Sequence, residues 1–543
     1  LEPPPESPLN SLCAEPTTLP MSKPSTFFLA GSFDDASLPA AVRDAVSAAA
    51  KKGIPDDDKP KKTEAAVTEH DMPLPGGGDG QRLRYRATAG TLPLRIGGEG
   101  KAKAELFYIA YEKLDVEHLD DRPLTFVFNG GPGSSSVWLH MGALGPKRVL
   151  LGDEGEPLAP PTKVVDNEWT WLDLTDVVFI DPVSTGLSRA AEGEDAKQFH
   201  TLEEDVKAVG EFIRLFCTRR QRWASPKFLV GESYGATRAA ALAHHLQGLH
   251  GIYLSGISLV SPALDFQVFF FDHANDLPYV LFLPTYAATA FFHKRLATGA
   301  FTDLASVVTQ AETFAIDTYA PALAKGGLLP DAEKAAIAEQ LAKLTGLSKQ
   351  LWLRSHLRIN DQQFFKELLR EEGKIVGRLD SRFVCKDVPR KAEDINADPS
   401  YSAVNGAFTA ALNAHLLGSL KYTSEAKYEI LYLDLEHWDF NAPNRYVSTT
   451  PDLLRAMTDN PRLRVNVCTG YFDAATPHFA SDYSTSHLGL DPSISARITT
   501  HRYEAGHMMY IRRPDLIKFK ADAAAFYASC ASGGPVVPTV IGP

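Results

Sequence analysis

The chain has 543 residues, of which 44% are hydrophobic and 22% charged, as in an ordinary soluble globular protein. Its 67 acidic and 55 basic side chains leave a formal net charge of −12, which argues against a nucleic-acid partner. No two of the five cysteines have metal-site spacing, so we expect no metal site, and no cofactor is predicted. The longest nearly uncharged run, residues 277–292, is short and contains two prolines, so we expect no membrane span.

Residues 1–66 are rich in proline, alanine, serine and charge, and they include "KKGIPDDDKPKK" at 51–62. Such a segment buries too little apolar surface to offset the entropy lost on ordering. We therefore predict a flexible, low-complexity N-terminal extension with one short helix near residues 38–51.

Short apolar runs and helical patterns alternate after this extension. The segments 83–95 and 104–113 alternate in polarity and carry aromatic residues, which is typical of antiparallel strands. Five short apolar runs predict buried strands, at residues 124–128, 176–180, 227–230, 256–260 and 464–467. Helices intervene, as at 201–216, where Thr201 and Glu204 predict a capping box. This alternation predicts a mostly parallel sheet covered on both faces.

The alternation breaks between residues 266 and 455, where helical patterns such as 331–344, 361–373 and 407–420 predominate. We interpret this stretch as a mainly helical insertion, or cap, in an α/β core. The predicted order is the extension (1–66), the first core segment (67–265), the insertion (266–455), the second core segment (456–533) and a C-terminal tail (534–543).

The pentapeptide "GESYG" at 231–235 follows a predicted buried strand that ends at Val230, and a helical pattern can begin directly after Gly235. Gly231 and Gly235 have no Cβ atoms, so strand and helix can approach closely around a sharp turn. Such a turn exposes the Ser233 hydroxyl and directs backbone N–H groups toward a substrate oxyanion. We interpret Ser233 as a nucleophile, with a small polar residue in a structural turn as the alternative.

A serine nucleophile needs a histidine base, which a carboxylate orients. In this type of fold the acid follows the serine along the chain and the histidine comes last. Asp473 ends the strand-like "RVNVCTGYFD", and His507 lies in a turn after "SARITTHRY". His478 and His501 are rivals for the base, and we expect both to be structural.

The segment "FNGGPGSSS" at 128–136 follows a predicted strand and contains three glycines. Glycine lets the backbone approach a ligand and direct its N–H groups toward it. A glycine-rich structural turn is the alternative. A phosphate-binding loop is excluded because no Lys-Ser/Thr pair closes the motif.

Together these motifs resemble the serine carboxypeptidase family of α/β-hydrolases. Over residues 85–533 the family's order is kept by "NGGPGSSS" (129–136), "LGP" (144–146), "VVFIDPVSTGLS" (177–188), "GESYG" (231–235), "GYFD" (470–473) and "AGHM" (505–508). The resemblance implies an α/β-hydrolase fold, with a mostly parallel central sheet flanked by helices and a mainly helical insertion domain.

The resemblance also implies a catalytic triad. Ser233 would attack the scissile carbonyl, His507 would relay the proton, and Asp473 would orient His507. The backbone N–H groups of Gly131 and Tyr234 would form the oxyanion hole.

In the family, the motif asparagine and the glutamate before the serine help to bind the C-terminal carboxylate of the substrate. The corresponding segment here is Asn129 with Gly130, and the glutamate is Glu232. Two full negative charges in contact repel, so Glu232 can bind a carboxylate only if the two share a proton. This requirement predicts a preference for acidic pH.

The chain departs from the family pattern at three positions. A second glutamate usually precedes "LGP", where this chain has Ala143, and a tryptophan usually occupies the position of Val127. Ser134 replaces the usual cysteine, so a disulfide of the eukaryotic members cannot form. This difference makes the chain look like the bacterial-type branch of the family.

We therefore predict a serine-type carboxypeptidase that acts through an acyl-enzyme on peptides with a free C-terminal carboxylate. Ala143 and Val127 keep open an esterase, amidase or acyltransferase with the same triad. A remote alternative is an inactive binding protein on a hydrolase scaffold. The start at Leu1 and the family's usual extracytoplasmic setting predict export to the periplasm or the medium. The oligomeric state, monomer or homodimer, stays open.

Overall fold

The computed structural model describes residues 65–532, apart from 79, 96–99, 388–397, 433–437, 441, 444 and 490. The helix predicted near 38–51 and the predicted tail at 534–543 lie outside the described residues, as does the predicted extension up to residue 64.

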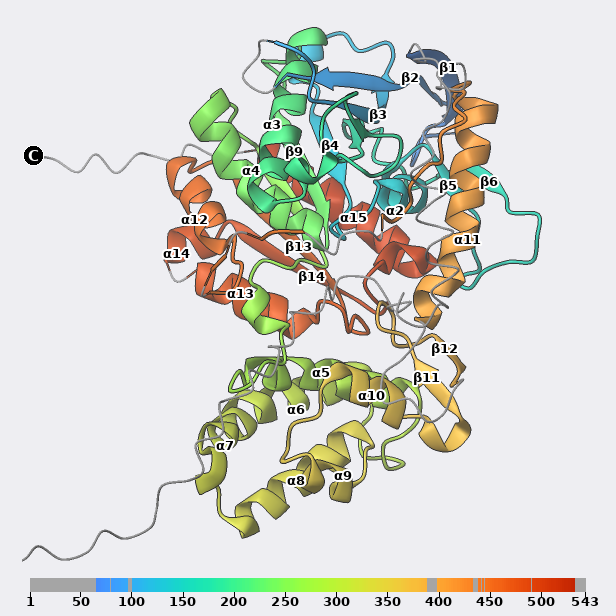
Figure 1. Ribbon diagram of the computed structural model, residues 1–543. Coiled ribbons are helices and arrows are strands. Elements are labelled where there is room, and N and C mark those ends of the chain that lie inside the picture. Colours follow the sequence, from blue (N-terminus) through green and yellow to red (C-terminus); the bar gives the residue numbers. More distant parts are fainter. Residues whose placement is uncertain are drawn as a thin grey trace, which may run out of the picture.

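A ten-stranded sheet forms the centre of the fold, in the order β1-β2-β3-β7-β4-β9-β10-β13-β14, with β8 beside β3 (Figure 1). The strands are β1 (Ala66–Pro73), β2 (Arg82–Leu94), β3 (Ala104–Lys113), β4 (Leu124–Phe128), β7 (Asp176–Ile180), β8 (Arg189–Ala190), β9 (Lys227–Glu232), β10 (Gly256–Val260), β13 (Arg464–Gly470) and β14 (Ile498–Tyr503). Pairings from β1 to β7 along this order are antiparallel, and those from β7 to β14 are parallel. The predicted α/β fold class is confirmed.

Helices bury both faces of this sheet (Figure 1). On one face, α3 (Leu202–Arg219), α4 (Tyr234–His250) and α12 (Thr450–Asp459) share a hydrophobic core with the strands. On the other face, α2 (Val137–Leu139), α11 (Pro399–Ala414) and α15 (Arg513–Ala531) do the same. Burial on both sides is why every residue of β4, β7 and β10 is buried and why these strands have continuous apolar sequences.

Helix α3 begins at its predicted N-cap. The Thr201 hydroxyl accepts the N–H of Glu204 at 3.1 Å. The second hydrogen bond of the predicted capping box would run from the Thr201 N–H to the Glu204 carboxylate. That carboxylate instead pairs with Lys207 at 2.7 Å. A lysine one helical turn away takes the carboxylate in place of the N-cap backbone.

Six helices form a separate body below the sheet in Figure 1: α5 (Leu277–Phe292), α6 (Leu304–Phe314), α7 (Ala320–Ala324), α8 (Asp331–Thr345), α9 (Lys349–Arg354) and α10 (Asp361–Glu367). They pack around a hydrophobic core of their own, which we call the helical body. A hairpin of β11 (Lys374–Val376) and β12 (Val384–Lys386) follows, and the sequence did not predict it because three-residue strands are too short to show a period. The predicted domain limits stay a prediction.

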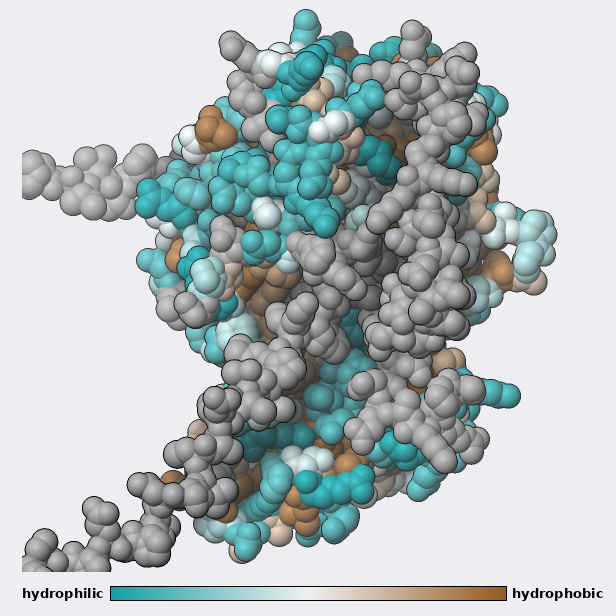
Figure 2. Space-filling view, viewed as in Figure 1, coloured by the Kyte–Doolittle hydropathy of each residue, from teal (hydrophilic) through white to brown (hydrophobic). Residues whose placement is uncertain are grey.

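The remaining elements complete the sheet edges. Strands β5 (Lys147–Val149) and β6 (Val164–Asp166) form a small separate hairpin, and α13 (His478–Leu488) and α14 (Pro492–Ser495) join β13 to β14. None of the described helices has the length and apolarity to cross a bilayer. The four described cysteines, Cys217, Cys385, Cys468 and Cys530, are free. The coloured residues on the face shown in Figure 2 are largely hydrophilic.

A buried ion cluster lies at the start of β7. Asp176 accepts from Arg122 Nε at 2.8 Å and from Arg222 Nη1 at 2.6 Å. All three side chains are at most 8% exposed. Removing one partner from such a cluster leaves buried charges without compensation.

We expect Asp176→Ala to lower the free energy of unfolding by about 3–5 kcal/mol, because two buried arginines then lose their carboxylate. Urea unfolding of the full chain measures this loss. The control is Asp71→Ala, which removes an exposed partner of Arg82 and costs less than about 1 kcal/mol. Equal losses in the two variants would contradict the assignment.

Candidate active site

Ser233 lies in the turn between β9 and α4. Its backbone has φ 61° and ψ −125°, a conformation that residues with side chains rarely adopt. The Ser233 N–H donates to the carbonyl of Val260, the last residue of β10, at 2.9 Å. A strained turn between a strand and a helix is the geometry of a nucleophile elbow.

The glycine-rich segment after β4 packs against this turn. A Cβ atom on Gly130 would lie 2.7 Å from the Glu232 carbonyl oxygen and 2.8 Å from the Gly235 nitrogen. No side chain fits there, so the two stretches of backbone are in direct contact. This contact brings residues 129–131 beside Ser233.

The predicted oxyanion donors, the N–H groups of Gly131 and Tyr234, lie at this contact. Tyr234 is the first residue of α4, so its N–H has no acceptor within the helix. Gly131 has φ 104°, which glycine tolerates and other residues do not. Among the described residues, neither N–H has a backbone acceptor. Both donors can therefore serve an oxygen of a bound molecule.

Asp473 and His507 lie together beyond the ends of the neighbouring parallel strands β13 and β14. His507 Nδ1 is 2.8 Å from Asp473 Oδ2, and both side chains are buried. The other ring nitrogen, Nε2, lies on the side away from Asp473. The Ser233 hydroxyl makes no hydrogen bond within the described part of the chain, so the acid and the base are joined but the base and the serine are not.

Thr476 completes the surroundings of Asp473, and sequence reasoning missed it. The N–H groups of Ala475 and Thr476 donate to Asp473 Oδ1 at 2.8 and 2.9 Å. The Thr476 hydroxyl oxygen is 2.8 Å from Asp473 Oδ2 and 3.1 Å from His507 Nδ1. A local sequence signal for these contacts was available, because an aspartate commonly accepts the N–H groups of the residues two and three positions further on.

The end of β10 connects the serine turn to the histidine. Val260 accepts the Ser233 N–H, and the Ser261 hydroxyl donates to the His507 carbonyl oxygen at 2.7 Å. Glu232 and His507 are also close enough to interact electrostatically. The structure therefore brings all the predicted site segments to one end of the parallel strands.

The charges around His507 favour its protonated form. Burial lowers the pKa of His507, but the charge and hydrogen bond of Asp473, together with the charge of Glu232, outweigh burial. Arg378 acts in the opposite direction, and the net effect raises the pKa above its ordinary value. The imidazole at this site can therefore hold a proton received from a nucleophile.

Glu232 is held by a tyrosine that the sequence did not point to. The Tyr510 hydroxyl donates to Glu232 Oε2 at 2.6 Å, and the Asn129 side chain bonds to both residues. Burial raises the pKa of Glu232 to about 7, although His507, Tyr510 and Asn129 each act to lower it. The Tyr510 ring also covers Gly142, where a Cβ atom would lie 2.6 Å from Tyr510 Cε2.

The rival histidines have other partners. His478 Nε2 lies 3.2 Å from Glu312, and His501 Nδ1 lies 3.4 Å from Asp522. Among the described residues, neither forms a hydrogen bond or an ion pair with Asp473, and their structural role stays a prediction.

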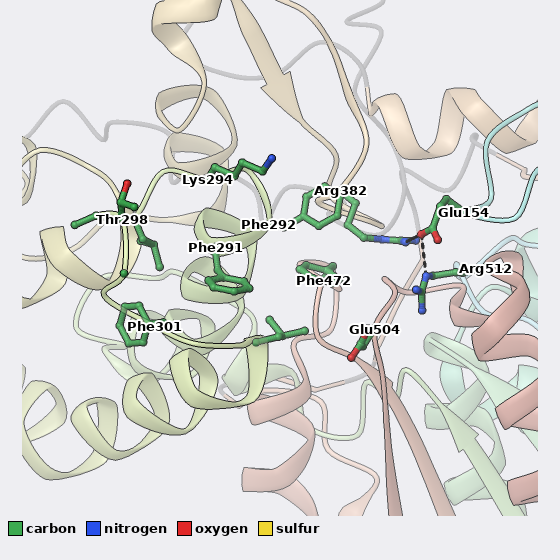
Figure 3. Close-up of a pocket in the computed structure, with 14 residues that line it drawn as sticks. Glu154, Phe291, Phe292, Lys294, Thr298, Phe301, Arg382, Phe472, Glu504 and Arg512 are labelled. Carbon is green, nitrogen blue, oxygen red and sulfur yellow. Dashed lines mark hydrogen bonds and ion pairs between the residues drawn. The ribbon is translucent and has the colours of Figure 1, made fainter.

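A cavity of about 550 Å³ lies where the helical body meets the loop before Asp473 (Figure 3). None of the predicted site residues lines it. Its walls combine aromatic and charged side chains, including Phe291, Phe292, Phe301, Phe472, Glu154, Lys294, Arg382 and Arg512.

The serine carboxypeptidase family model matches residues 83–268, which include the glycine-rich segment and the Ser233 turn. Pheromone-processing carboxypeptidase KEX1 of Komagataella phaffii is 37% identical over 101 residues, 18% of this chain and 14% of that protein. Serine carboxypeptidase-like 50 of Arabidopsis thaliana is 29% identical over 147 residues, 26% of this chain and 31% of that protein. The chain thus matches less than a third of the length of either relative.

The crystal structure of Kex1(delta)p, a prohormone-processing carboxypeptidase from Saccharomyces cerevisiae, has the same fold. Its TM-score is 0.50 at 16% identity, covering 82% of this chain and 91% of that one. Residues 83–268 are thus similar to the serine carboxypeptidase family, and the chain shares the fold of this carboxypeptidase structure.

Proposed function

We propose that the protein is a serine-type carboxypeptidase that removes the C-terminal residue of peptides. The observation that carries this proposal is the 2.8 Å contact between His507 and Asp473 at the same strand ends as the Ser233 turn. The family match supports the substrate class.

In the proposed reaction, Ser233 Oγ attacks the scissile carbonyl carbon, and His507 Nε2 takes the hydroxyl proton. The Asp473 carboxylate stabilises the resulting imidazolium through its bond to Nδ1. The N–H groups of Gly131 and Tyr234 stabilise the oxyanion. His507 then protonates the leaving amine, and water releases the acid from the acyl-enzyme by the same route in reverse.

Asn129, with Gly130, and Glu232 are the proposed site for the substrate's C-terminal carboxylate. Among the described residues, no lysine or arginine forms an ion pair with Glu232, and burial raises its pKa to about 7, so it carries a proton at acidic pH. A protonated Glu232 can donate to a carboxylate, whereas an ionised one repels it. Tyr510 supports the proposal because its hydroxyl orients the glutamate where the family's second glutamate is absent.

A transferase or esterase with the same triad is a second candidate. Ala143, at the position of the family's second glutamate, is fully buried. Its methyl side chain has no polar atom that could bind a carboxylate. Product analysis with water alone and with an added alcohol or amine separates hydrolysis from transfer. Export, the bacterial-type branch and the oligomeric state stay predictions from the sequence.

We expect Ser233→Ala to abolish covalent labelling by a fluorophosphonate and to lower kcat by about 10⁶-fold, because no other nucleophile lies in the turn. Asp473→Asn should lower kcat by about 10⁴-fold, since the amide no longer selects the productive tautomer of His507. Labelling of the intact chain and peptide hydrolysis measure both effects. Full labelling of Ser233→Ala would show that another residue reacts.

The pH profile separates the exopeptidase from a general hydrolase. For a blocked dipeptide with a free carboxylate, kcat/KM should rise as His507 loses its proton and fall above about pH 7, by about tenfold per unit, as Glu232 ionises.

The same dipeptide amidated at its C-terminus should show the rising limb alone, because nothing in it needs a protonated Glu232. Glu232→Gln, which cannot ionise, should remove the falling limb for the free acid. Equal rates and equal profiles for the free acid and the amide would leave a general esterase or amidase.

A further inference from the structure

Four consecutive residues, 378–381, connect the helical body to the two loops that carry the proposed acid, Asp473, and the proposed base, His507. We call them the clamp segment. They lie between β11 and β12, next to the junction of the helical body and the sheet (Figure 1). Each of the four makes a hydrogen bond to one of the two loops.

Two residues of the clamp segment bind the loop of His507. The Leu379 carbonyl oxygen accepts the N–H of His507 itself at 2.6 Å. The Asp380 carboxylate accepts the N–H of Gly506 at 3.0 Å. A Cβ atom on Gly506 would lie 2.5 Å from Asp380 Cβ, so this approach requires glycine.

The other two residues bind the loop of Asp473. The Arg378 carbonyl oxygen accepts the N–H of Ala474 at 3.1 Å. The N–H and the hydroxyl of Ser381 both donate to the Phe472 carbonyl oxygen, at 2.9 and 3.1 Å. Phe472 and Ala474 are the immediate neighbours of Asp473, so the clamp segment holds the acid from both sides.

The clamp segment is itself anchored to two helices. The Asp398 carboxylate, at the N-cap of α11, accepts the N–H groups of Arg378 and Leu379 at 3.2 Å each. The Ser381 hydroxyl lies 2.6 Å from the Thr289 hydroxyl of α5. The segment is therefore held by α11 and α5 as well as by the two loops.

An arginine holds the Asp380 carboxylate in place. Arg382 Nη2 is 2.6 Å from Asp380 Oδ2, and both side chains are at most 5% exposed. Figure 3 shows Arg382 close to Phe472, with Glu154 between Arg382 and Arg512. Arg382 is thus paired within the protein.

We propose that the clamp segment positions Asp473 and His507 relative to each other, with Asp380 and Ser381 as positioning residues. The inference rests on the proposed function, because it assumes that these two residues act together on Ser233. The hydrogen bond between Asp473 and His507 joins two loops that follow different strands, and the clamp segment is hydrogen-bonded to both loops. A displacement of about 1 Å in a catalytic group can cost about 100-fold in rate.

The test uses the full chain with Asp380→Ala, Asp380→Asn and Ser381→Ala. For Asp380→Ala and Ser381→Ala we expect the fluorophosphonate labelling rate and kcat to fall together by about 10- to 100-fold, with KM changed less than about twofold. Asp380→Asn should lose less, because its amide oxygen still accepts the Gly506 N–H.

The pH profile adds a readout that a loss of stability does not move. If Asp473 shifts away from His507, the rising limb should move to lower pH, because Asp473 raises the pKa of His507. The other charged groups that act on His507 are Glu232 and Arg378, and no variant alters either side chain.

The matched control is Asp276→Asn, which removes a bidentate ion pair with Arg358 in the helical body, far from the clamp contacts in the sequence. It should label and turn over at the wild-type rate. Wild-type rates and pH profile in Ser381→Ala and Asp380→Asn would overturn the inference, even if Asp380→Ala fails to fold. A wild-type chain that is not labelled would overturn the proposed function itself.

Discussion

The burial of one charge organises this site. The Asp473 carboxylate is fully removed from water, and such a charge is tolerated only where hydrogen bonds replace its hydration. The N–H groups of Ala475 and Thr476, the Thr476 hydroxyl and the His507 ring supply them. The hydrogen bonds to this carboxylate bring the ends of β13 and β14 together. They leave the second ring nitrogen of His507, Nε2, for a nucleophile.

The parallel sheet brings the other groups to the same edge. The glycine-rich segment follows β4 and Ser233 follows β9, and these two strands are neighbours. Their loops touch through backbone at Gly130, where any side chain would collide with the serine turn. Parallel strands end on one side, so groups hundreds of residues apart in the chain meet there without a dedicated scaffold.

The helical body packs against the loop that carries Asp473. Phe472 and Ala474, on either side of Asp473, are part of its hydrophobic core, although they follow a strand of the sheet. The clamp segment adds hydrogen bonds to the same loop and to the loop of His507. The helical body and the clamp segment thus both contact the residues on either side of Asp473, and Tyr510 holds Glu232 through a hydrogen bond.

The features that depend on a local pattern of residues could be predicted before the structure was known. Strands buried on both faces are continuous apolar runs, and the Ser233 turn requires glycines at fixed offsets, so β4, β7, β10 and the turn were predictable. The contacts that these features make with distant residues came from the folded structure. Tyr510 lies 278 residues from Glu232, and the clamp segment reaches Phe472 from more than 90 residues away. No local pattern encodes such contacts, because they arise only when separate elements pack against each other.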